Sequence, residues 1–143
     1  MAQRPRERRS MTADEIHDYL DTRSEWAVLT TLSPTGFPHS VTLGYFRLGD
    51  DIYLGMKDGT QKVRNAQRDP RASVLVTTSK ESGVIDGVLL QGRAAILRDD
   101  AERLAVAQEA ARQRGKAEST ATVSADGVYL RLTPERVISW RYD

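Results

Sequence analysis

The sequence predicts a mainly-β α+β fold, a small barrel of six to seven antiparallel strands with about three helices. Short apolar runs are separated by turn residues, a pattern that is typical of antiparallel strands. Three segments have helical periodicity, and they fall at connections between strands. A chain of 143 residues has room for one such domain. The sequence contains neither a Gly-rich dinucleotide loop nor a Walker motif, so it does not favour a doubly wound sheet.

The first half of the chain is predicted to hold two helices and three strands. Thr12 and Glu15 form a capping box that begins a short helix with an apolar face. A second helix covers residues 61–68, with Thr60 as its N-cap, and Pro70 ends it. The strands are predicted at residues 26–32, 37–48 and 52–56.

The second half is predicted to hold four strands and one long helix. Asp99 caps a helix at residues 100–114, and Gly115 is placed to end it. The sequence Thr133-Pro134-Glu135 indicates a turn, so the last two strands are predicted to form a hairpin. The strands are predicted at residues 72–78, 87–97, 127–132 and 136–141.

Composition narrows the class of protein. A net charge of +1 does not favour a nucleic-acid-binding protein, and no apolar run approaches the length that spans a membrane. The absence of cysteine excludes disulfides and thiolate metal sites. We therefore expect a cytoplasmic protein with no nucleic-acid or membrane partner. Residues 1–11 are rich in arginine and are predicted to be a flexible tail, followed by a single domain at residues 12–143.

The start of the helix at residues 61–68 is a candidate anion site. The first turn of a helix presents free backbone N–H groups and the positive end of the helix dipole. Lys62 stands one turn in, where it adds a full charge for the same anion. A cofactor phosphate is the ligand that fits such a site, although a solvated basic helix between two strands would have the same sequence.

The beginning of the strand at residues 37–48 carries polar side chains on both of its faces. Alternation places Ser40 and Thr42 on one face, and His39 and Val41 on the other. One of these faces either lines a ligand groove or presents hydroxyl groups to water.

The remaining residues give little support for chemistry by side chains alone. The two histidines, His17 and His39, lie far apart in sequence, and no nucleophile elbow is present. Two histidines and scattered acids are also too few for a metal site. We predict no catalytic side chain and no metal, so a cofactor must carry the reactive atoms of any redox chemistry.

Four segments, in this order, resemble the pyridoxamine-phosphate-oxidase-like split β-barrel superfamily. The resemblance is strongest to its small deazaflavin (coenzyme F420)-dependent oxidoreductase branch and covers roughly residues 12–142. The segments are Val-Leu-Thr-Thr-Leu at 28–32, Gly-Phe-Pro-His at 36–39, Gln-Lys-Val-Arg-Asn at 61–65 with Asp-Pro-Arg-Ala-Ser-Val at 69–74, and Leu-Gln-Gly-Arg-Ala at 90–94.

The resemblance implies a barrel of the FMN-binding split type and a homodimer with cofactor sites between the subunits. It implies that Lys62 binds the cofactor phosphate, while two strands line the ring and its side chain. Gln91 would lie on a partner-facing strand, where Gly92 either permits a close approach or marks a bulge. The predicted cofactor-binding residues are His39, Ser40, Val41, Thr42, Gly55, Met56, Lys57, Gln61, Lys62 and Asn65.

The function that follows from the resemblance is hydride transfer between coenzyme F420 and a small unsaturated organic molecule. Two alternatives stay open, an FMN-dependent oxidoreductase on the same fold and a carrier that binds a flavin or deazaflavin without turnover. Cations near the phosphate would favour F420, because its oligoglutamate tail continues beyond that group. Lys57, Arg64 and Arg68 are the candidates, and Asn65 could instead fix the local loop geometry.

Overall fold

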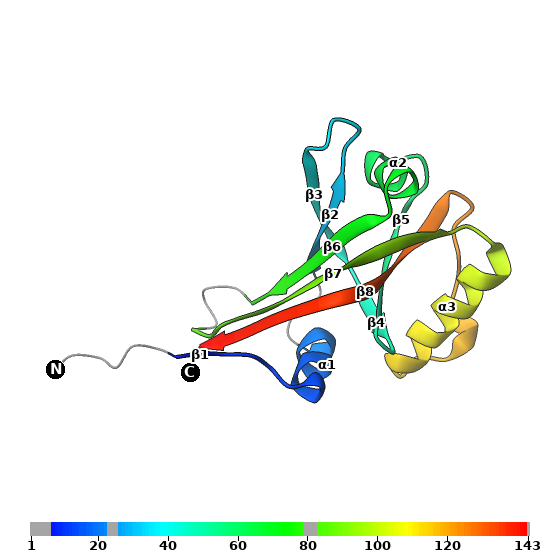
Figure 1. Ribbon diagram of the computed structural model, residues 1–143. Helices are drawn as coiled ribbons and strands as arrows, with labels where there is room; N and C mark the ends of the chain where they lie inside the picture. The colour runs from blue at the N-terminus through cyan, green and yellow to red at the C-terminus, as the bar shows by residue number, and fades with distance from the viewer. Residues whose placement is uncertain (1–6, 23–25, 79–82, 143) are drawn as a thin grey trace.

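Seven antiparallel strands follow one another across a curled sheet in the computed structural model, which describes residues 7–22, 26–78 and 83–142. Their order is β3-β2-β6-β7-β8-β5-β4, and a short eighth strand, β1, pairs with the end of β8 (Figure 1). The predicted α+β split barrel is thereby confirmed. The strands are β1 Arg8–Arg9, β2 Trp26–Leu32, β3 Pro38–Gly44, β4 Phe46–Leu48, β5 Asp51–Lys57, β6 Arg71–Thr77, β7 Ile85–Leu97 and β8 Gly127–Tyr142.

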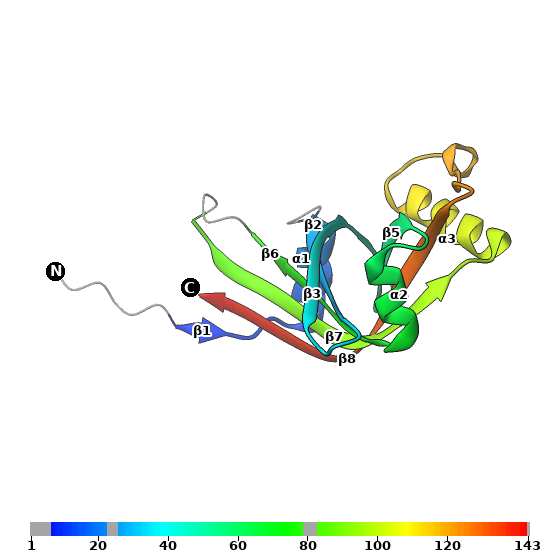
Figure 2. The ribbon, with the colours of Figure 1, turned by 90° about the horizontal axis from the view of Figure 1, so that it is seen from above.

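Three α-helices lie at the connections, as predicted. Helix α1 is close to the paired ends of β1 and β8, whereas α3 lies at the far end of the long β7–β8 pair (Figures 1 and 2). No helix in the described ranges combines the length and apolar character needed to cross a membrane. The helices are α1 Ala13–Thr22, α2 Gln61–Arg68 and α3 Asp100–Gln113, with a 3₁₀ turn, η2, at Glu118–Thr120.

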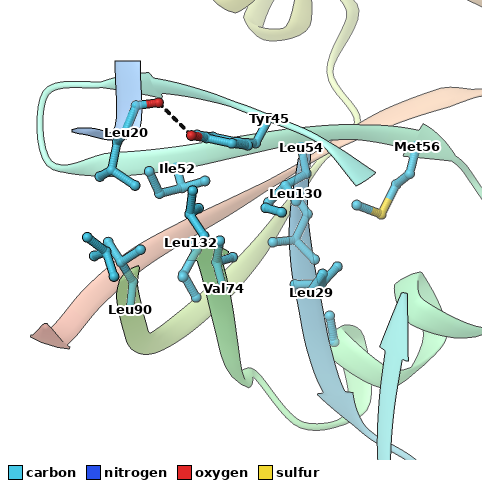
Figure 3. Close-up of a cluster of buried hydrophobic side chains, with 14 of the residues drawn as sticks. Leu20, Leu29, Tyr45, Ile52, Leu54, Met56, Val74, Leu90, Leu130 and Leu132 are labelled. Carbon is cyan, nitrogen blue, oxygen red and sulfur yellow. Dashed lines mark hydrogen bonds between the residues drawn. The ribbon is translucent and has the colours of Figure 1, made fainter. Parts of the chain in front are cut away.

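One hydrophobic core fills the concave side of the sheet. Because alternate residues of each strand point inward, the core draws on β2, β5, β6, β7 and β8, and α1 adds Tyr19 and Leu20. Figure 3 shows these side chains gathered between the strands. The labelled residues are Leu20, Leu29, Tyr45, Ile52, Leu54, Met56, Val74, Leu90, Leu130 and Leu132.

The strand predicted at residues 37–48 is in fact two strands that lie on opposite edges of the sheet. β3 pairs with β2, whereas β4 pairs with β5, and the chain changes edge at Tyr45. The buried Tyr45 hydroxyl donates a hydrogen bond to the Leu20 carbonyl oxygen at 2.5 Å, which fixes the crossing point (Figure 3). Tyrosine and phenylalanine suit strands, so the sequence pattern does not reveal the break.

The predicted C-terminal hairpin is wrong, because β8 runs without a turn from Gly127 to Tyr142. It pairs with β7 along its length, and the register shifts between Gln91 and Gly92, opposite Pro134. A bulge tolerates proline because a residue there need not donate to the strand ladder. The residues that suggested a turn therefore mark an irregularity within one long strand.

Part of the N-terminal segment that was predicted to be a flexible tail forms a short strand. Arg8 and Arg9 form β1 and pair with Tyr142 and Arg141 of β8, while residues 1–6 lie outside the described ranges. The sheet therefore extends into the segment predicted as flexible.

The predicted capping box of α1 is present and is joined to a partly exposed network of charges. The Glu15 N–H donates to Thr12 Oγ1 at 3.2 Å, and the Thr12 N–H donates to Glu15 Oε1 at 3.1 Å. Arg9 donates two hydrogen bonds to the Glu15 carboxylate, and Arg141 donates one. These contacts, led by the hydrogen bonds from Arg9, lower the pKa of Glu15 to about 2.

We expect Glu15→Gln to remove part of the acid sensitivity of the fold. A carboxylate with a lowered pKa stabilises the folded state above its unfolded pKa, near 4.5, and this contribution is lost as the pH falls through about 2. Urea unfolding across this window should therefore show a smaller decline for the variant than for the wild type. Glu102→Gln, at an exposed position on α3, is the control and should keep the wild-type decline.

Candidate functional site

The first turn of α2 is open at its N-terminal end. The helix begins at Gln61 as predicted, and Thr60 has the extended backbone of an N-cap. Its hydroxyl does not cap the helix, however, because it donates to the Lys57 carbonyl oxygen at 2.9 Å. The first-turn N–H groups therefore have no side-chain cap, which corrects the role predicted for Thr60 and leaves the positive helix end to an anion.

Lys62 lies half-buried on this first turn, and no carboxylate in the described ranges forms an ion pair with it. The neighbouring acids bind other cations. Asp58 pairs with Arg98 at 3.0 Å, and Asp69 pairs with Arg71 at 2.7 Å. The hydrogen bonds from these arginines lower the pKa of both carboxyls, that of Asp69 to about 2. The charge of Lys62 therefore remains available to a ligand.

Asn65 and Gln61 connect α2 to the sheet. The Asn65 side chain is fully buried, and its Nδ2 donates to Thr31 Oγ1 on β2 at 3.2 Å. Its Oδ1 accepts from Gln61 Nε2 at 2.7 Å, and Gln61 Oε1 accepts from Arg64. Asn65 thus holds the helix in place, which is the alternative role that its sequence position left open.

The two faces of β3 differ as the alternation predicts. Ser40 and Thr42 are exposed, and Ser40 Oγ lies 2.8 Å from Thr30 Oγ1 on β2. His39 and Val41 point inward, His39 opposite Thr31 and Val41 against the core. The Nδ1 atom of His39 is buried without a hydrogen-bond partner, so a polar group brought by a ligand would satisfy it.

The predicted residues of β5 divide between its two faces. Met56 is 9% exposed and belongs to the core, so only its backbone can reach a ligand (Figure 3). Gly55 and Lys57 point the other way, into a hollow of about 290 Å3 beside α3. Lys57 Nζ lies 3.8 Å from Asp126 Oδ2 across this hollow. All three consecutive residues therefore border this hollow, although Met56 is also part of the core.

Two free strand edges meet next to α2. β3 is the last strand on one side of the sheet, and on the other side β4 pairs with β5 only as far as Tyr53. The free part of β5 leads into α2, which contacts β2, and β3 and β5 also contact each other. Figure 1 shows α2 beside the end of β5 and close to β2 and β3. The structure thus places His39 opposite Thr31, which is bonded to Asn65 of α2, while Gly55 and Lys57 border the hollow beside α3.

A polar groove of about 430 Å3 on the convex side of the sheet was only partly predicted. Four of its lining residues lie at paired positions on neighbouring strands, so their side chains share one face of the sheet. They are Thr30, Ser73, Gln91 and Arg136. Of the residues that line the groove, the sequence indicated Gln91 and Gly92. The signal for the others is the strand register, which a single sequence does not supply.

In the described part of the chain, few side chains are placed to act as a general acid or a general base. No three His, Asp or Glu side chains in it are grouped so as to hold a metal ion. The arrangement can bind an anion at α2 and present a strand edge to a planar group. Any redox chemistry at this site would depend on a bound cofactor.

Comparisons with known proteins agree with this geometry. The family described as pyridoxamine 5'-phosphate oxidase matches residues 12–141. A search of curated proteins found no match. Among solved structures, a conserved hypothetical protein of Mycobacterium tuberculosis is 25% identical, with a TM-score of 0.76 over 92% of this chain and 85% of that one.

Two further solved structures are more distant in sequence and share the fold. One is described as a FAD-binding protein of Mesorhizobium loti, with 20% identity and a TM-score of 0.71 over 96% of this chain and 98% of that one. The other is described as an F420 reductase, with 16% identity and a TM-score of 0.61 over 85% of this chain and 94% of that one.

Proposed function

Because the chain belongs to the pyridoxamine 5'-phosphate oxidase family over residues 12–141, we propose that it is an oxidoreductase that uses coenzyme F420. The reaction would transfer a hydride between the deazaflavin and a small unsaturated organic molecule. The described functions of two structural neighbours, FAD binding and F420 reduction, support a flavin-type cofactor.

The observation that carries the proposal is Lys62, which pairs with no carboxylate among the residues that the structure describes, at a helix end without a side-chain cap. Its ammonium and the first-turn N–H groups of α2 would hold the cofactor phosphate. From there β3 offers its free edge, with His39 Nδ1 in need of a polar partner. The residues present therefore fit a phosphorylated group with a planar ring.

When bound, the deazaflavin supplies the hydride chemistry, and the protein supplies position and environment. Ser40 and Thr42 would orient the ring and its side chain from β3, while Asn65 keeps α2 at the required distance through Thr31. Lys62 would hold the phosphate end of the cofactor in place. We assign no general acid, and water would supply the proton.

A second copy of the chain would complete the site. The polar groove with Thr30, Ser73, Gln91 and Arg136 lies on the convex side of the sheet, away from the core. In the proposed homodimer this groove would face the partner's cofactor. Size determination in solution by light scattering tests this part of the proposal, and a monomer would contradict it.

FMN is the alternative cofactor, because it carries the same phosphate. The cations expected to bind an oligoglutamate tail already have partners. Lys57 lies near Asp126, Arg64 donates to Gln61, and Arg68 donates to the Leu32 carbonyl oxygen. These residues therefore do not decide between the two cofactors. A carrier without turnover would also have the same binding residues.

Calorimetric titration of the purified protein with F420, and separately with FMN, tests the proposal. We expect micromolar or tighter binding of F420 and weaker binding of FMN. Tighter binding of FMN than of F420 would make FMN the cofactor in place of the deazaflavin. If neither F420 nor FMN bound, the proposal would be overturned. Tight F420 binding without oxidation of the reduced cofactor by any of a panel of enones and quinones would favour a carrier.

A further inference from the structure

A hollow of about 710 Å3, larger than the two described above, lies where β3 gives way to β4. The C-terminal ends of α1 and α3 and the start of β2 complete its wall. Figure 1 shows α1, β4 and α3 next to one another in this part of the molecule. The hollow has no role in the binding of the cofactor phosphate, which α2 would hold elsewhere.

Aromatic rings form part of the wall. Trp26 is 61% exposed there, and it pairs in register with Gly44, which has no side chain to cover it. Phe46 is held in a fixed orientation, because it stacks on Tyr53 with ring centroids 5.5 Å apart and meets Tyr129 edge-on at 5.8 Å. One exposed ring and one partly exposed, fixed ring in the same wall favour a planar, conjugated ligand.

The charges of the described residues that line the hollow do not cancel. Arg47 is neutralised by Asp21, to which it donates two hydrogen bonds of 2.9 and 2.6 Å. Arg114 lies over the Phe46 ring at 5.8 Å from its centroid, and in the described ranges it has no carboxylate partner. Among the described residues that line the hollow, one positive charge therefore remains beside an aromatic surface, which favours an anionic group on the ligand.

The hollow also continues the surface of β3 that carries Ser40 and Thr42. Gly44 lies on the same face of the strand as Thr42, because side chains two residues apart point the same way. The separation along the strand is roughly 7 Å. A molecule in the hollow would therefore lie next to whatever occupies the outer face of β3.

We infer that this hollow binds a planar conjugated molecule that carries one anionic group. Trp26 and Phe46 bind its rings, and Arg114 binds its anion. The role of the hollow as the site of the hydride acceptor rests on the proposed function. The binding of a planar anionic molecule in the hollow does not depend on that function.

The test uses 2-naphthoate as the probe and the full chain without cofactor. In a titration followed by ¹H–¹⁵N NMR, we expect shifts at the Trp26 indole N–H and the Gly44 amide. Arg114→Gln should weaken naphthoate binding roughly tenfold, the loss expected from a charge-assisted contact, and leave binding of neutral 2-naphthamide unchanged. Phe46→Leu should weaken both ligands. Lys116→Gln removes a nearby exposed charge outside the hollow and should change neither.

Three outcomes would overturn the inference. They are the absence of shifts at Trp26 and Gly44, an equal loss of affinity in the Lys116→Gln control, and exclusion of naphthoate by bound F420. The failure of the proposed function would look different. In that case F420 would not bind the wild-type protein, while naphthoate would still bind with the dependence on Arg114.

Discussion

Replacing Lys62 with alanine is expected to weaken the binding of F420 or FMN at least tenfold. The lost contact is a charge-assisted hydrogen bond to phosphate, worth about 1.5–3 kcal/mol, and 1.4 kcal/mol corresponds to a factor of ten in affinity. The effect is large because no described carboxylate neutralises this lysine in the absence of the ligand. Calorimetric titration of the variant measures it directly.

The matched control is Lys116→Ala, which removes the same charge from an exposed position beyond the end of α3. Its cofactor affinity should equal that of the wild type, and both variants should unfold at the wild-type urea concentration. An unchanged affinity in a folded Lys62→Ala protein would contradict the assignment of the phosphate to α2.

Replacing Gly92 with alanine is expected to destabilise the fold by about 3 kcal/mol or more, at the upper end of what overpacking costs. A Cβ atom at this position would lie 2.0 Å from the Thr133 carbonyl oxygen and 2.8 Å from the Pro134 Cα. Both are backbone atoms of β8, so no side-chain rotation can relieve the clash. Urea unfolding measures the loss of stability.

Gly55→Ala is the control for this experiment. The added methyl group would meet only the Tyr129 ring, at an ordinary contact distance of 3.5 Å. Its stability should change by about 1 kcal/mol or less, the range of strand propensities. Similar stability of the two variants would show that the β7–β8 bulge adapts to a side chain.

The sequence was sufficient to predict the elements that depend on local signals. Helix α2 begins and ends at the predicted residues, since Pro70 and the preceding Asp58-Gly59 turn restrict it from both sides. The break at Tyr45 and the continuity of β8 could not be predicted, because both depend on contacts with distant residues. Tyr45 bonds to Leu20, and Pro134 lies opposite Gly92.

The candidate site shows the same division. The position of Lys62 in the first turn of α2 could be predicted, because the start of the helix could be predicted from the local sequence. The opposite orientations of Met56 and Lys57 follow from strand alternation, as those of the β3 side chains do. The burial of Asn65 depends on Thr31, which is 34 residues away, and no local pattern indicates it.

The position of β8 in the sheet has a consequence for synthesis of the protein on the ribosome. β8 joins β7 to β5, so the strands β3-β2-β6-β7 and the pair β5-β4 become one sheet only through β8, which follows all of them in the chain. Until β8 leaves the exit tunnel, the nascent chain exposes the unpaired edges of β7 and β5. Before β8 is in place these edges are open to pairing with other chains, so the partly folded protein depends on protection from aggregation.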